Sequence, residues 1–335
     1  MSTADRGAAD TVLVTGAAGF IGSRLVGRLE ADGRSVRGID CFTDFYDVGL
    51  KRQRIERLVS PIEDIDLRSG DLGRVLSGVG AVVHLAGQPG VRPSWGSGFA
   101  DYVGHNISAT QRLLEACASA GVRRFVGASS SSIYGALRHP FTDEATLPAP
   151  VSPYGVTKLA AEHLTSLYGT ERGIETVSLR FFSVYGPGQR PDMAIARLID
   201  CARSGEPFPR FGDGTQRRDL TFVDDVVDVV LRSLAADLPA GTVLNVGGGE
   251  SVSLNDMIEA VERLTGADLS IDSRPRAAGD VDITSADCTL ADRLLGWRPS
   301  VGFRDGIAAQ VADSLDAETS HPSAASMPTP QGDRA

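Results

Sequence analysis

Residues 11–22, TVLVTGAAGFIG, join a short apolar run to a helical pattern through a turn that contains Gly16, Gly19 and Gly22. The apolar run predicts a buried strand over 11–16, and the pattern from Phe20 to Ala31 predicts a helix. Glycines at such a junction let the backbone approach a pyrophosphate, which binds at the N-terminus of the helix. The spacing is GxxGxxG, so the turn taken alone can also be purely structural.

The alternation of strand-like and helix-like segments continues from this turn. Further strands are expected over 34–40, 81–87, 123–130 and 175–184, and residues 154–169 form a helical pattern. Such alternation predicts an α/β fold, a Rossmann-like doubly wound parallel sheet with helices on both faces. After residue 186 the chain becomes rich in loops, and its remaining pattern predicts a smaller C-terminal α+β domain. That pattern consists of helices over 225–237 and 253–266 and a strand over 241–248.

The composition excludes several classes of protein. A net charge of −10 argues against nucleic-acid and membrane-surface partners, because both are anionic. The four cysteines are far apart and the five histidines have no ligand-like spacing, so we expect reduced thiols, no metal and a cytoplasmic location. The chain has neither an apolar run of membrane-spanning length nor a signal-like N-terminus.

Asp40 ends the second expected strand, 18 residues after Gly22. A carboxylate at that place can accept hydrogen bonds from the adenosine ribose hydroxyls of a dinucleotide. It also repels a 2′-phosphate, and the following Cys41 and Phe42 provide no positive charge to neutralise one. The cofactor expected here is therefore NAD rather than NADP. The alternative is that Asp40 is a solvated turn residue.

Lys158 stands four residues after Tyr154, and it is one of only two lysines among 33 basic residues; the other is Lys51. An ammonium one helical turn from a phenol lies on the same face and favours the phenolate, which makes Tyr154 a usable base. Ser130, in the run ASSSSIYG over 128–135, follows the end of an expected parallel strand and can hydrogen-bond a substrate hydroxyl. The serine run can also be only a polar loop.

Together these motifs resemble the extended short-chain dehydrogenase/reductase family, in particular its NAD-dependent nucleotide-sugar epimerases and dehydratases. The resemblance covers about residues 11–312, and further matching segments are GDL (70–72), HLAGQPGVRPSW (84–95), HNISATQRLLEA (105–116), RFFSVYGPGQRPDM (180–193), GDGTQRRDLTFVDD (212–225) and NVGGG (245–249). It implies that Tyr154, Lys158 and Ser130 are catalytic. It further implies that the cofactor contacts Gly16, Gly19, Phe20, Ile21, Gly22, Asp40, Asp71, Leu72, Leu85, Ala86, Gln88, Tyr154, Lys158 and Phe181, with Asp71 at the adenine.

Within this family the chain is most similar to the UDP-glucuronate 4-epimerases, through DCFTDFYDVGLKR (40–52), GQPGVRPSW (87–95) and GQRPDM (188–193). The resemblance places Arg190 against the sugar carboxylate, with Ser131 and Ser132 as hydroxyl partners, and Arg218 at the diphosphate. The full set of expected substrate residues is Arg92, Ser131, Ser132, Ser183, Arg190, Arg218 and Arg276. Arg190 can alternatively be a surface arginine or a phosphate contact.

Two departures from the family pattern bear on the substrate. Ser183 stands where many UDP-hexose epimerases have an asparagine, and Ala277 stands where some members have a second diphosphate arginine. Arg276 or Arg274 can take over the second role, so the nucleotide base stays open.

The expected reaction is 4-epimerisation of UDP-glucuronate through a 4-keto sugar. UDP-glucose 4-epimerase is the first alternative, and UDP-glucuronate decarboxylase ranks after it. A 4,6-dehydratase is disfavoured because Ser131 and Ser132 replace the neighbouring acid and base that it needs. An alternative of another class is a non-catalytic sensor of NAD or sugar nucleotides, which has no need of Tyr154 and Lys158.

The expected organisation follows from these assignments. Residues 11–185 form the NAD-binding domain, to which 221–250 return, and 186–220 with 251–316 form the substrate-binding domain. Residues 1–10 are expected to be flexible and 317–335 disordered, because the tail is small, polar and proline-containing. The family pairs the helices near 99–120 and 153–170, so a homodimer is expected, with apolar contacts from Tyr102, Val103, Leu113, Leu114, Leu159, Leu164 and Leu167.

Overall fold

The structure, a computed structural model, describes residues 11–136, 141–276 and 281–320. The expected flexible segment 1–10, Ala277 and the tail 321–335 lie outside the described residues. The strands are β1 (Thr11–Thr15), β2 (Val36–Asp40), β3 (Ile62–Asp64), β4 (Val79–His84), β5 (Arg124–Ser130), β6 (Glu175–Phe181), β7 (Ser183–Tyr185), β8 (Phe208–Phe211), β9 (Arg217–Phe222), β10 (Thr242–Val246), β11 (Ser251–Ser253) and β12 (Ile271–Arg274).

The helices connect these strands. They are α1 (Phe20–Ala31), α2 (Val48–Ile55), α3 (Leu72–Leu76), α4 (Phe99–Tyr102), a π-helix (Val103–Ser108), α5 (Ala109–Ala120), α6 (Pro153–Arg172), α7 (Ala194–Ser204), α8 (Val223–Ala235), α9 (Leu254–Thr265), α10 (Thr289–Leu295) and α11 (Phe303–Ser320). Short 3-10 helices cover Arg92–Ser94, Gly96–Gly98 and Ser131–Ile133. Among the described helices, none has the length and apolar character that a membrane crossing requires.

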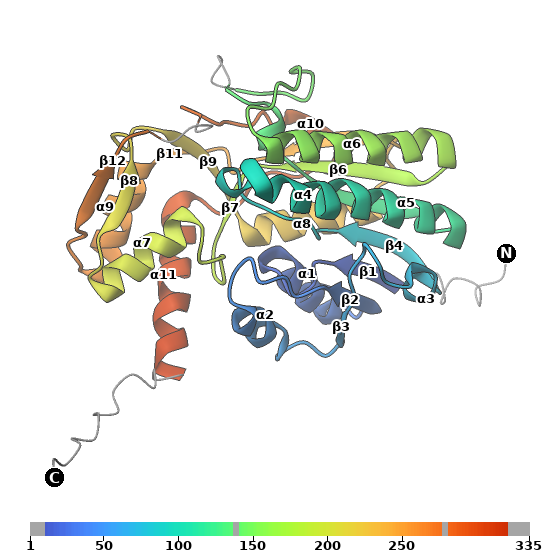
Figure 1. Ribbon diagram of the computed structural model, residues 1–335, viewed down its shortest axis with the longest axis horizontal. Coiled ribbons are helices and arrows are strands. Elements are labelled where there is room, and N and C mark those ends of the chain that lie inside the picture. Colours follow the sequence, from blue (N-terminus) through green and yellow to red (C-terminus); the bar gives the residue numbers. More distant parts are fainter. Residues whose placement is uncertain (1–10, 137–140, 277–280, 321–335) are drawn as a thin grey trace, which may run out of the picture.

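Seven strands form the central sheet, in the order β10-β6-β5-β4-β1-β2-β3 (Figure 1). Every neighbouring pair runs parallel; for example, Val14 of β1 lies opposite Gly38 of β2 and Val83 of β4. The strand order reverses between β1 and β4, which creates a crevice at the carboxyl ends of these two strands. The predicted Rossmann-like doubly wound sheet is confirmed.

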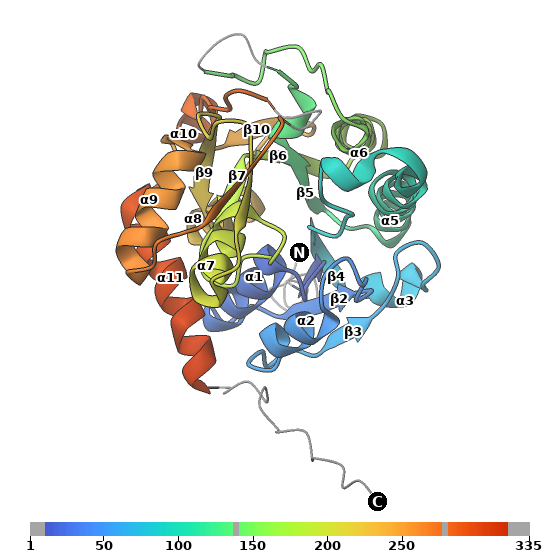
Figure 2. The ribbon, with the colours of Figure 1, turned by 60° about the vertical axis from the view of Figure 1, so that its left-hand side comes forward.

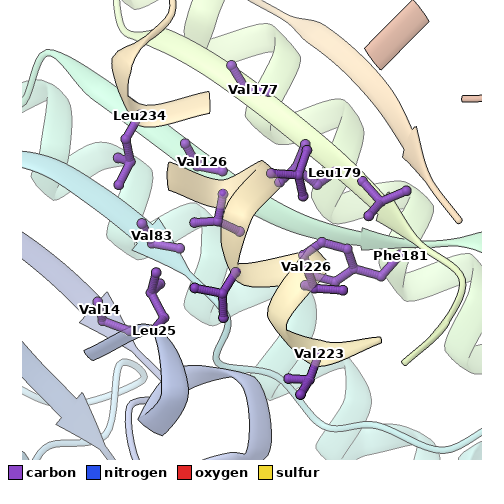
Figure 3. Packing of buried hydrophobic residues seen from close by; sticks show 14 of the residues in the cluster. Val14, Leu25, Val83, Val126, Val177, Leu179, Phe181, Val223, Val226 and Leu234 are labelled. Atoms are coloured by element: carbon purple, nitrogen blue, oxygen red, sulfur yellow. The ribbon is translucent and has the colours of Figure 1, made fainter. Parts of the chain in front are cut away.

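Helices cover both faces of this sheet. On one face α1 and α8 contribute Leu25, Val223 and Val226 to a cluster with inward side chains of β1, β4, β5 and β6 (Figure 3). On the other face α3, α5 and α6 enclose a second cluster that includes Leu113 and Phe125. Both faces are apolar, as expected for a parallel sheet buried between helix layers.

The smaller unit lies beside the carboxyl edge of the large sheet. It contains the three-stranded sheet β11-β9-β7, the pair β12-β8, and helices α7, α9 and α11 around a third apolar cluster (Figure 2). Helix α9 begins with a capping box, because Ser253 accepts from the Asp256 N–H while the Asp256 side chain accepts from the Ser253 N–H. This unit corresponds to the expected smaller α+β domain.

The expected domain boundaries stay predictions, and the packing differs from them at three places. Strand β7 pairs with β9, so Ser183–Tyr185 group with the smaller sheet. Helix α10 packs on α8 and β10, because the fully buried Trp297 behind it joins the core of the large sheet. Residues 317–320, expected to be disordered, continue α11, since alanine and glutamate in DSLDAET favour helix over the small residues that follow.

Candidate active site

A cavity of about 690 Å³ opens at the carboxyl edge of the large sheet and extends toward the smaller unit. Its walls come from the loops after β1, β2, β3, β4 and β5, from the start of α6, and from the segment after β6. Of the expected site residues, those that line it are Gly16, Gly19, Phe20, Ile21, Gly22, Asp40, Leu85, Ala86, Gln88, Arg92, Ser130, Ser131, Ser132, Tyr154, Lys158, Phe181, Ser183, Arg190 and Arg218.

The glycine-rich turn forms the floor of one end of the cavity. Gly16 has φ +69°, and a Cβ there would lie 2.8 Å from the Ala86 nitrogen. A Cβ on Gly22 would lie 2.1 Å from the Gly16 oxygen, so the helix can start against the turn only with glycine at this position. Gly19 is the N-cap of α1, and it has no side chain to occupy the first-turn N–H groups. The turn therefore presents an unobstructed helix N-terminus to an anion.

Asp40 is buried at the end of β2 and faces the same turn. Its carboxylate accepts from the Ala18 N–H at 3.1 Å and from the Phe42 N–H at 2.8 Å. These bonds fix the carboxylate and leave further lone pairs for ribose hydroxyls.

Asp71 and Leu72 are placed differently from the expectation. Asp71 caps the N-terminus of α3 by accepting from the Arg74 N–H, and Leu72 is buried in the second apolar cluster, so neither lines the cavity. Asp66 and Leu67 line it instead. They follow β3 by two and three residues, whereas Asp71 follows by seven, and ligand sites of parallel sheets lie directly after the strands. The number of residues after the end of β3 is therefore the signal that distinguishes Asp66-Leu67 from Asp71-Leu72.

Tyr154 lies in the first turn of α6. Ser152 caps this helix by accepting from the Gly155 N–H at 3.1 Å, and Pro153 provides a helical φ at the first position. Burial raises the pKa of the Tyr154 hydroxyl, while its hydrogen bond with Ser130 and the positive charge of Arg190 lower it. The structure thus brings Tyr154 and Ser130 together, with Arg190 close enough to act on the phenol electrostatically.

Lys158 lies one turn further along α6 and donates to the Ala128 carbonyl of β5. Burial lowers the pKa of the Lys158 ammonium to about 8, and the charge of Glu162 opposes this effect. A lysine with this pKa carries its charge in most molecules near neutral pH. It can therefore stabilise a phenolate on the same helix face.

The serine run turns sharply at the end of β5. The Ser130 side chain accepts from the Ser132 N–H at 3.1 Å, and Ser131 and Ser132 enter a short 3-10 helix. All four serines of the run, residues 129–132, line the cavity. The catalytic role of Ser130 stays a prediction.

Asn106, which we did not single out from the sequence, connects two walls of the cavity. Its amide oxygen accepts from the Gln88 N–H at 2.7 Å, and its amide nitrogen donates to the Gln88 carbonyl and to the Thr157 hydroxyl, both at 3.0 Å. The π-helix that carries Asn106 interrupts the helical segment from α4 to α5, and such turns occur often at functional sites. The residue fixes the loop after β4 to the first turns of α6.

Arg190 lines the cavity on the loop between β7 and α7. Its Nε and Nη2 atoms donate to the two carboxylate oxygens of Asp192 at 2.9 and 2.8 Å. Arg190 also lies over the ring of Phe45, 5.8 Å from the centroid. One planar edge of the guanidinium is thus held by Asp192, and Nη2 also donates to the Met193 sulfur at 3.5 Å. Nη1 takes no part in these bonds.

The other expected arginines occupy different places. Arg92 lines the cavity and lies over the Phe211 ring, 4.2 Å from its centroid, which joins the loop after β4 to β8. Arg218 lines the cavity and donates to the Val281 carbonyl at 2.8 Å. Arg276 pairs with Asp282 on the surface and does not line the cavity, and Arg274 pairs with Asp272. Both arginines are held in exposed ion pairs outside the cavity, and their expected role at the diphosphate stays a prediction.

Lys51 was also missed, although it is the second of the chain's two lysines. It is buried in the cavity wall, and its Nζ donates to the Thr43 carbonyl at 2.8 Å and hydroxyl at 3.1 Å. Burial lowers the pKa of Lys51, and the charge of Asp40 opposes this. The sequence did contain a signal for Lys51: nearly all other basic residues of the chain are arginines, so a lysine at this position indicates a specific role.

The residues at this edge fit a dinucleotide. A Cβ on Gly16 or Gly22 would fill the space in the turn between β1 and α1, and the N-terminus of α1 faces this turn. Asp40 lies at the end of the neighbouring strand, β2. Within 11–136, 141–276 and 281–320, no group of three or more histidine, cysteine or acidic side chains could hold a metal ion.

Comparisons with known proteins place the chain among sugar-nucleotide enzymes. Residues 12–247 match the model of the NAD dependent epimerase/dehydratase family. A Bacillus subtilis protein named as an uncharacterised UDP-glucose epimerase, YtcB, is 41% identical over 90% of this chain and 96% of its own length. The UDP-glucuronate 4-epimerase of Thermodesulfobacterium geofontis is 38% identical over 88% and 93%. The crystal structure of UDP-glucuronic acid 4-epimerase from Bacillus cereus, with UDP-glucuronic acid and NAD, is 40% identical, with a TM-score of 0.88 over 92% of this chain and 99% of that one.

Proposed function

The chain belongs to the NAD-dependent epimerase/dehydratase family, and from this premise we propose that it is a nucleotide-sugar 4-epimerase that converts UDP-glucuronate to UDP-galacturonate. The observation that carries the proposal is the meeting of three groups in one cavity. These are the hydrogen-bonded pair Tyr154 and Ser130, and Arg190, whose positive charge acts on the same phenol. A base for a sugar hydroxyl and a fork for a carboxylate are the two groups that such a substrate requires.

Tyr154 takes the proton from the C4 hydroxyl of the sugar and later returns it. Lys158 favours the phenolate form through its positive charge, and Ser130 hydrogen-bonds the same oxygen during the transfer. The sugar passes through a 4-keto form, which turns within the cavity before C4 is reduced from its opposite face.

NAD, when bound, accepts the C4 hydride and gives it back. Gly16, Gly19 and Gly22 would hold its pyrophosphate at the start of α1, and Asp40 would accept from the adenosine ribose. Asp66 lines the end of the cavity where adenine would lie. Because the cofactor is regenerated in each cycle, the complete reaction needs no external oxidant.

Arg190 provides recognition of the uronate. A carboxylate in a closed cleft costs several kcal/mol to desolvate unless it is paired, and a guanidinium binds both of its oxygens. Ser131 and Ser132 line the same cavity and would add hydroxyl donors, and Arg218, which also lines it, would meet the diphosphate. A second consequence follows from stabilising the carboxylate charge, because this raises the barrier to losing CO₂ from the 4-keto sugar.

UDP-glucose 4-epimerisation is the second candidate, and the similarity to YtcB favours it. The two activities differ only in whether the sugar carries a carboxylate, so Arg190 is the discriminating residue. Incubation of the protein with each sugar nucleotide in turn, with products identified by NMR, separates them. Absorbance in the reduced-nicotinamide band after substrate addition separates either enzyme from a non-catalytic sensor.

The proposal includes a homodimer. The structure buries Tyr102, Leu113 and Leu114 in the chain's own core, so these expected contact residues are not available to a partner. Four other apolar side chains are exposed on or next to α4 and α6. Leu167 and Val156 lie on α6, Phe99 is the first residue of α4, and Trp95 precedes α4, with Leu167 52% and Trp95 53% exposed. These four side chains support a second copy of the chain at this face. Light scattering at micromolar concentration tests the proposal, and a monomer would contradict it.

We also keep the cytoplasm as the proposed location. Cys41, Cys117, Cys201 and Cys288 are all free thiols, which suits a reducing compartment.

A further inference from the structure

The loop that carries Arg190 is held by a helix more than a hundred residues away in the sequence. Gln310 lies on α11 and is only 2% exposed, and its side-chain oxygen accepts from the Gly186 N–H at 2.9 Å. Gly186 has φ +132°, and a Cβ there would lie 2.9 Å from Val223. The loop therefore starts with a positive φ that glycine adopts readily, and the hydrogen bond from the Gly186 N–H to Gln310 stabilises this conformation.

The other end of the Gln310 amide reaches the residue next to Arg190. Its nitrogen donates to the side-chain oxygen of Gln189 at 2.8 Å. Gln189 in turn accepts from the Ala196 N–H at 3.1 Å and donates to the Val184 carbonyl at 3.0 Å. Backbone groups at both ends of this chain of bonds fix which amide atom is donor and which is acceptor. The two glutamines thus form a defined bridge from α11 to both ends of the loop.

A second contact from the same helix supports this arrangement. Asp313, three residues after Gln310 and so on the same helix face, accepts from the Gly188 N–H at 2.9 Å. From the opposite side, Arg54 of α2 donates to the Gly188 carbonyl at 2.8 Å and to the Tyr46 hydroxyl at 2.6 Å. The turn before Arg190 therefore lies between α11 and α2. Figure 2 shows α7, which follows the loop, beside α11.

We propose that Gln310 is the positioning residue for Arg190, and that its bridge through Gln189 sets the enzyme's selectivity for a uronate over a neutral hexose. This inference rests on the proposed function, in which Arg190 binds the substrate carboxylate. A guanidinium fork demands a narrow range of positions, since a displacement of about 1 Å in a bound geometry can cost roughly 10²-fold in rate. The neutral hexose has no carboxylate at that place, so its turnover depends less on where Arg190 lies.

The test compares Gln310→Leu with Val311→Ala, a buried neighbour on the same helix that gives no hydrogen bond to the loop. Gln310→Leu should lower kcat/KM for UDP-glucuronate by roughly tenfold or more, the scale of losing buried hydrogen bonds, and that for UDP-glucose by less than about threefold. Val311→Ala should change both substrates equally. Gln189→Leu removes the other half of the bridge at a less buried position and should give the same loss of selectivity.

A double-mutant cycle separates positioning from general damage. If Gln310 acts through Arg190, Gln310→Leu should change UDP-glucuronate turnover by less than about twofold when Arg190→Ala is already present. Amide hydrogen exchange of residues 186–193 should rise in Gln310→Leu and in Gln189→Leu but not in Val311→Ala. This measurement needs no substrate, so it tests the bridge even where turnover is low.

The outcomes are distinct. Additive losses in the cycle, or equal losses on both substrates, would overturn the positioning role even if exchange rises. Unchanged exchange over 186–193 in both glutamine variants would show that the bridge does not hold the loop, and the inference would fail while the proposed function stands. A wild-type protein without preference for UDP-glucuronate would instead refute the proposed function, and the selectivity claim with it.

Discussion

The guanidinium of Arg190 and the carboxylate of Asp192 form a two-bond ion pair in the cavity wall, with N–O distances of 2.9 and 2.8 Å. Asp192 uses the Nε–Nη2 edge of the guanidinium, and Nη2 also donates to the Met193 sulfur at 3.5 Å, so Asp192 orients Arg190 without using its Nη1 atom. Asp192 also brings a negative charge near the place proposed for the substrate carboxylate. We therefore expect the pair to admit a substrate carboxylate only where it approaches in the plane of the guanidinium, away from Asp192.

Arg190→Ala should lower UDP-glucuronate turnover by roughly 10²-fold, the scale of losing a charge-assisted hydrogen-bonded pair. Arg190→Lys should lose nearly as much, because a point charge cannot replace a planar fork. UDP-glucose turnover should fall far less, and CO₂ released per turnover of UDP-glucuronate should rise. Steady-state kinetics on both substrates check this; equal losses would move Arg190 to a phosphate-binding or structural role.

Tyr154→Phe should reduce turnover by roughly 10²- to 10⁴-fold while NAD and substrate still bind, because the variant lacks only the proton-transfer group. Lys158→Ala should do similar damage and weaken NAD as well. Turnover is measured beside binding by calorimetry. Retention of more than a few per cent of activity by Tyr154→Phe would mean that another group is the base.

Asp66→Ala and Asp71→Ala provide a matched pair for the cofactor end of the cavity. Asp66 lines the cavity, so its loss should weaken NAD roughly tenfold or more. Asp71 caps α3, so its loss should leave the Kd for NAD unchanged and cost about 1 kcal/mol of unfolding free energy. Cofactor titration and denaturant unfolding measure both quantities; a reversed pattern would restore Asp71 to the adenine site.

His84 predicts a pH dependence of stability. Its ring nitrogens bond Thr15 and Thr110 at 2.8 and 2.9 Å, and burial lowers its pKa to about 3. The unfolded chain binds this proton near pH 6.5, so the stability from neutral His84 is present above that pH and is lost as the pH falls toward 3. Between about pH 7 and about pH 5 the loss should be about 2 kcal/mol.

His84→Gln should remove this acid-sensitive part, so the difference in unfolding free energy between wild type and variant should shrink as the pH falls. Burial raises the pKa of Asp219 to about 6, so Asp219 makes both proteins more stable as the pH falls. This contribution cancels when the unfolding free energy of the variant is subtracted from that of the wild type. A difference that stays constant with pH would mean that His84 is not held neutral.

Much of the fold follows from local patterns. The strands and helices of the large sheet were predictable because apolar runs, glycines and helical periodicity coincide there, and helix α1 begins and ends where its pattern does. The placement of Ser130, Tyr154 and Lys158 on one cavity was also predictable, since the first lies at a strand end and the other two on one helix face. Each of these patterns can be recognised within a short stretch of neighbouring residues.

The remainder depends on contacts between distant segments. Asp71 was expected at the adenine, yet Asp66, which also precedes a leucine, lines the cavity, and the end of β3 distinguishes the two. Tyr102 was expected at an interface because it is apolar, yet its hydroxyl donates to the Pro89 carbonyl at 2.7 Å inside the chain. The bridge from Gln310 to Gln189 joins residues 121 positions apart, and no local pattern encodes such a pair.

The most direct test of the account is the activity of the unmodified protein on UDP-glucuronate and UDP-glucose, each supplied alone and followed by NMR at the anomeric and C4 protons. We predict that UDP-glucuronate is converted to UDP-galacturonate without added cofactor, and with a higher kcat/KM than that for UDP-glucose. A higher kcat/KM for UDP-glucose than for UDP-glucuronate would contradict the uronate assignment and the role given to Arg190.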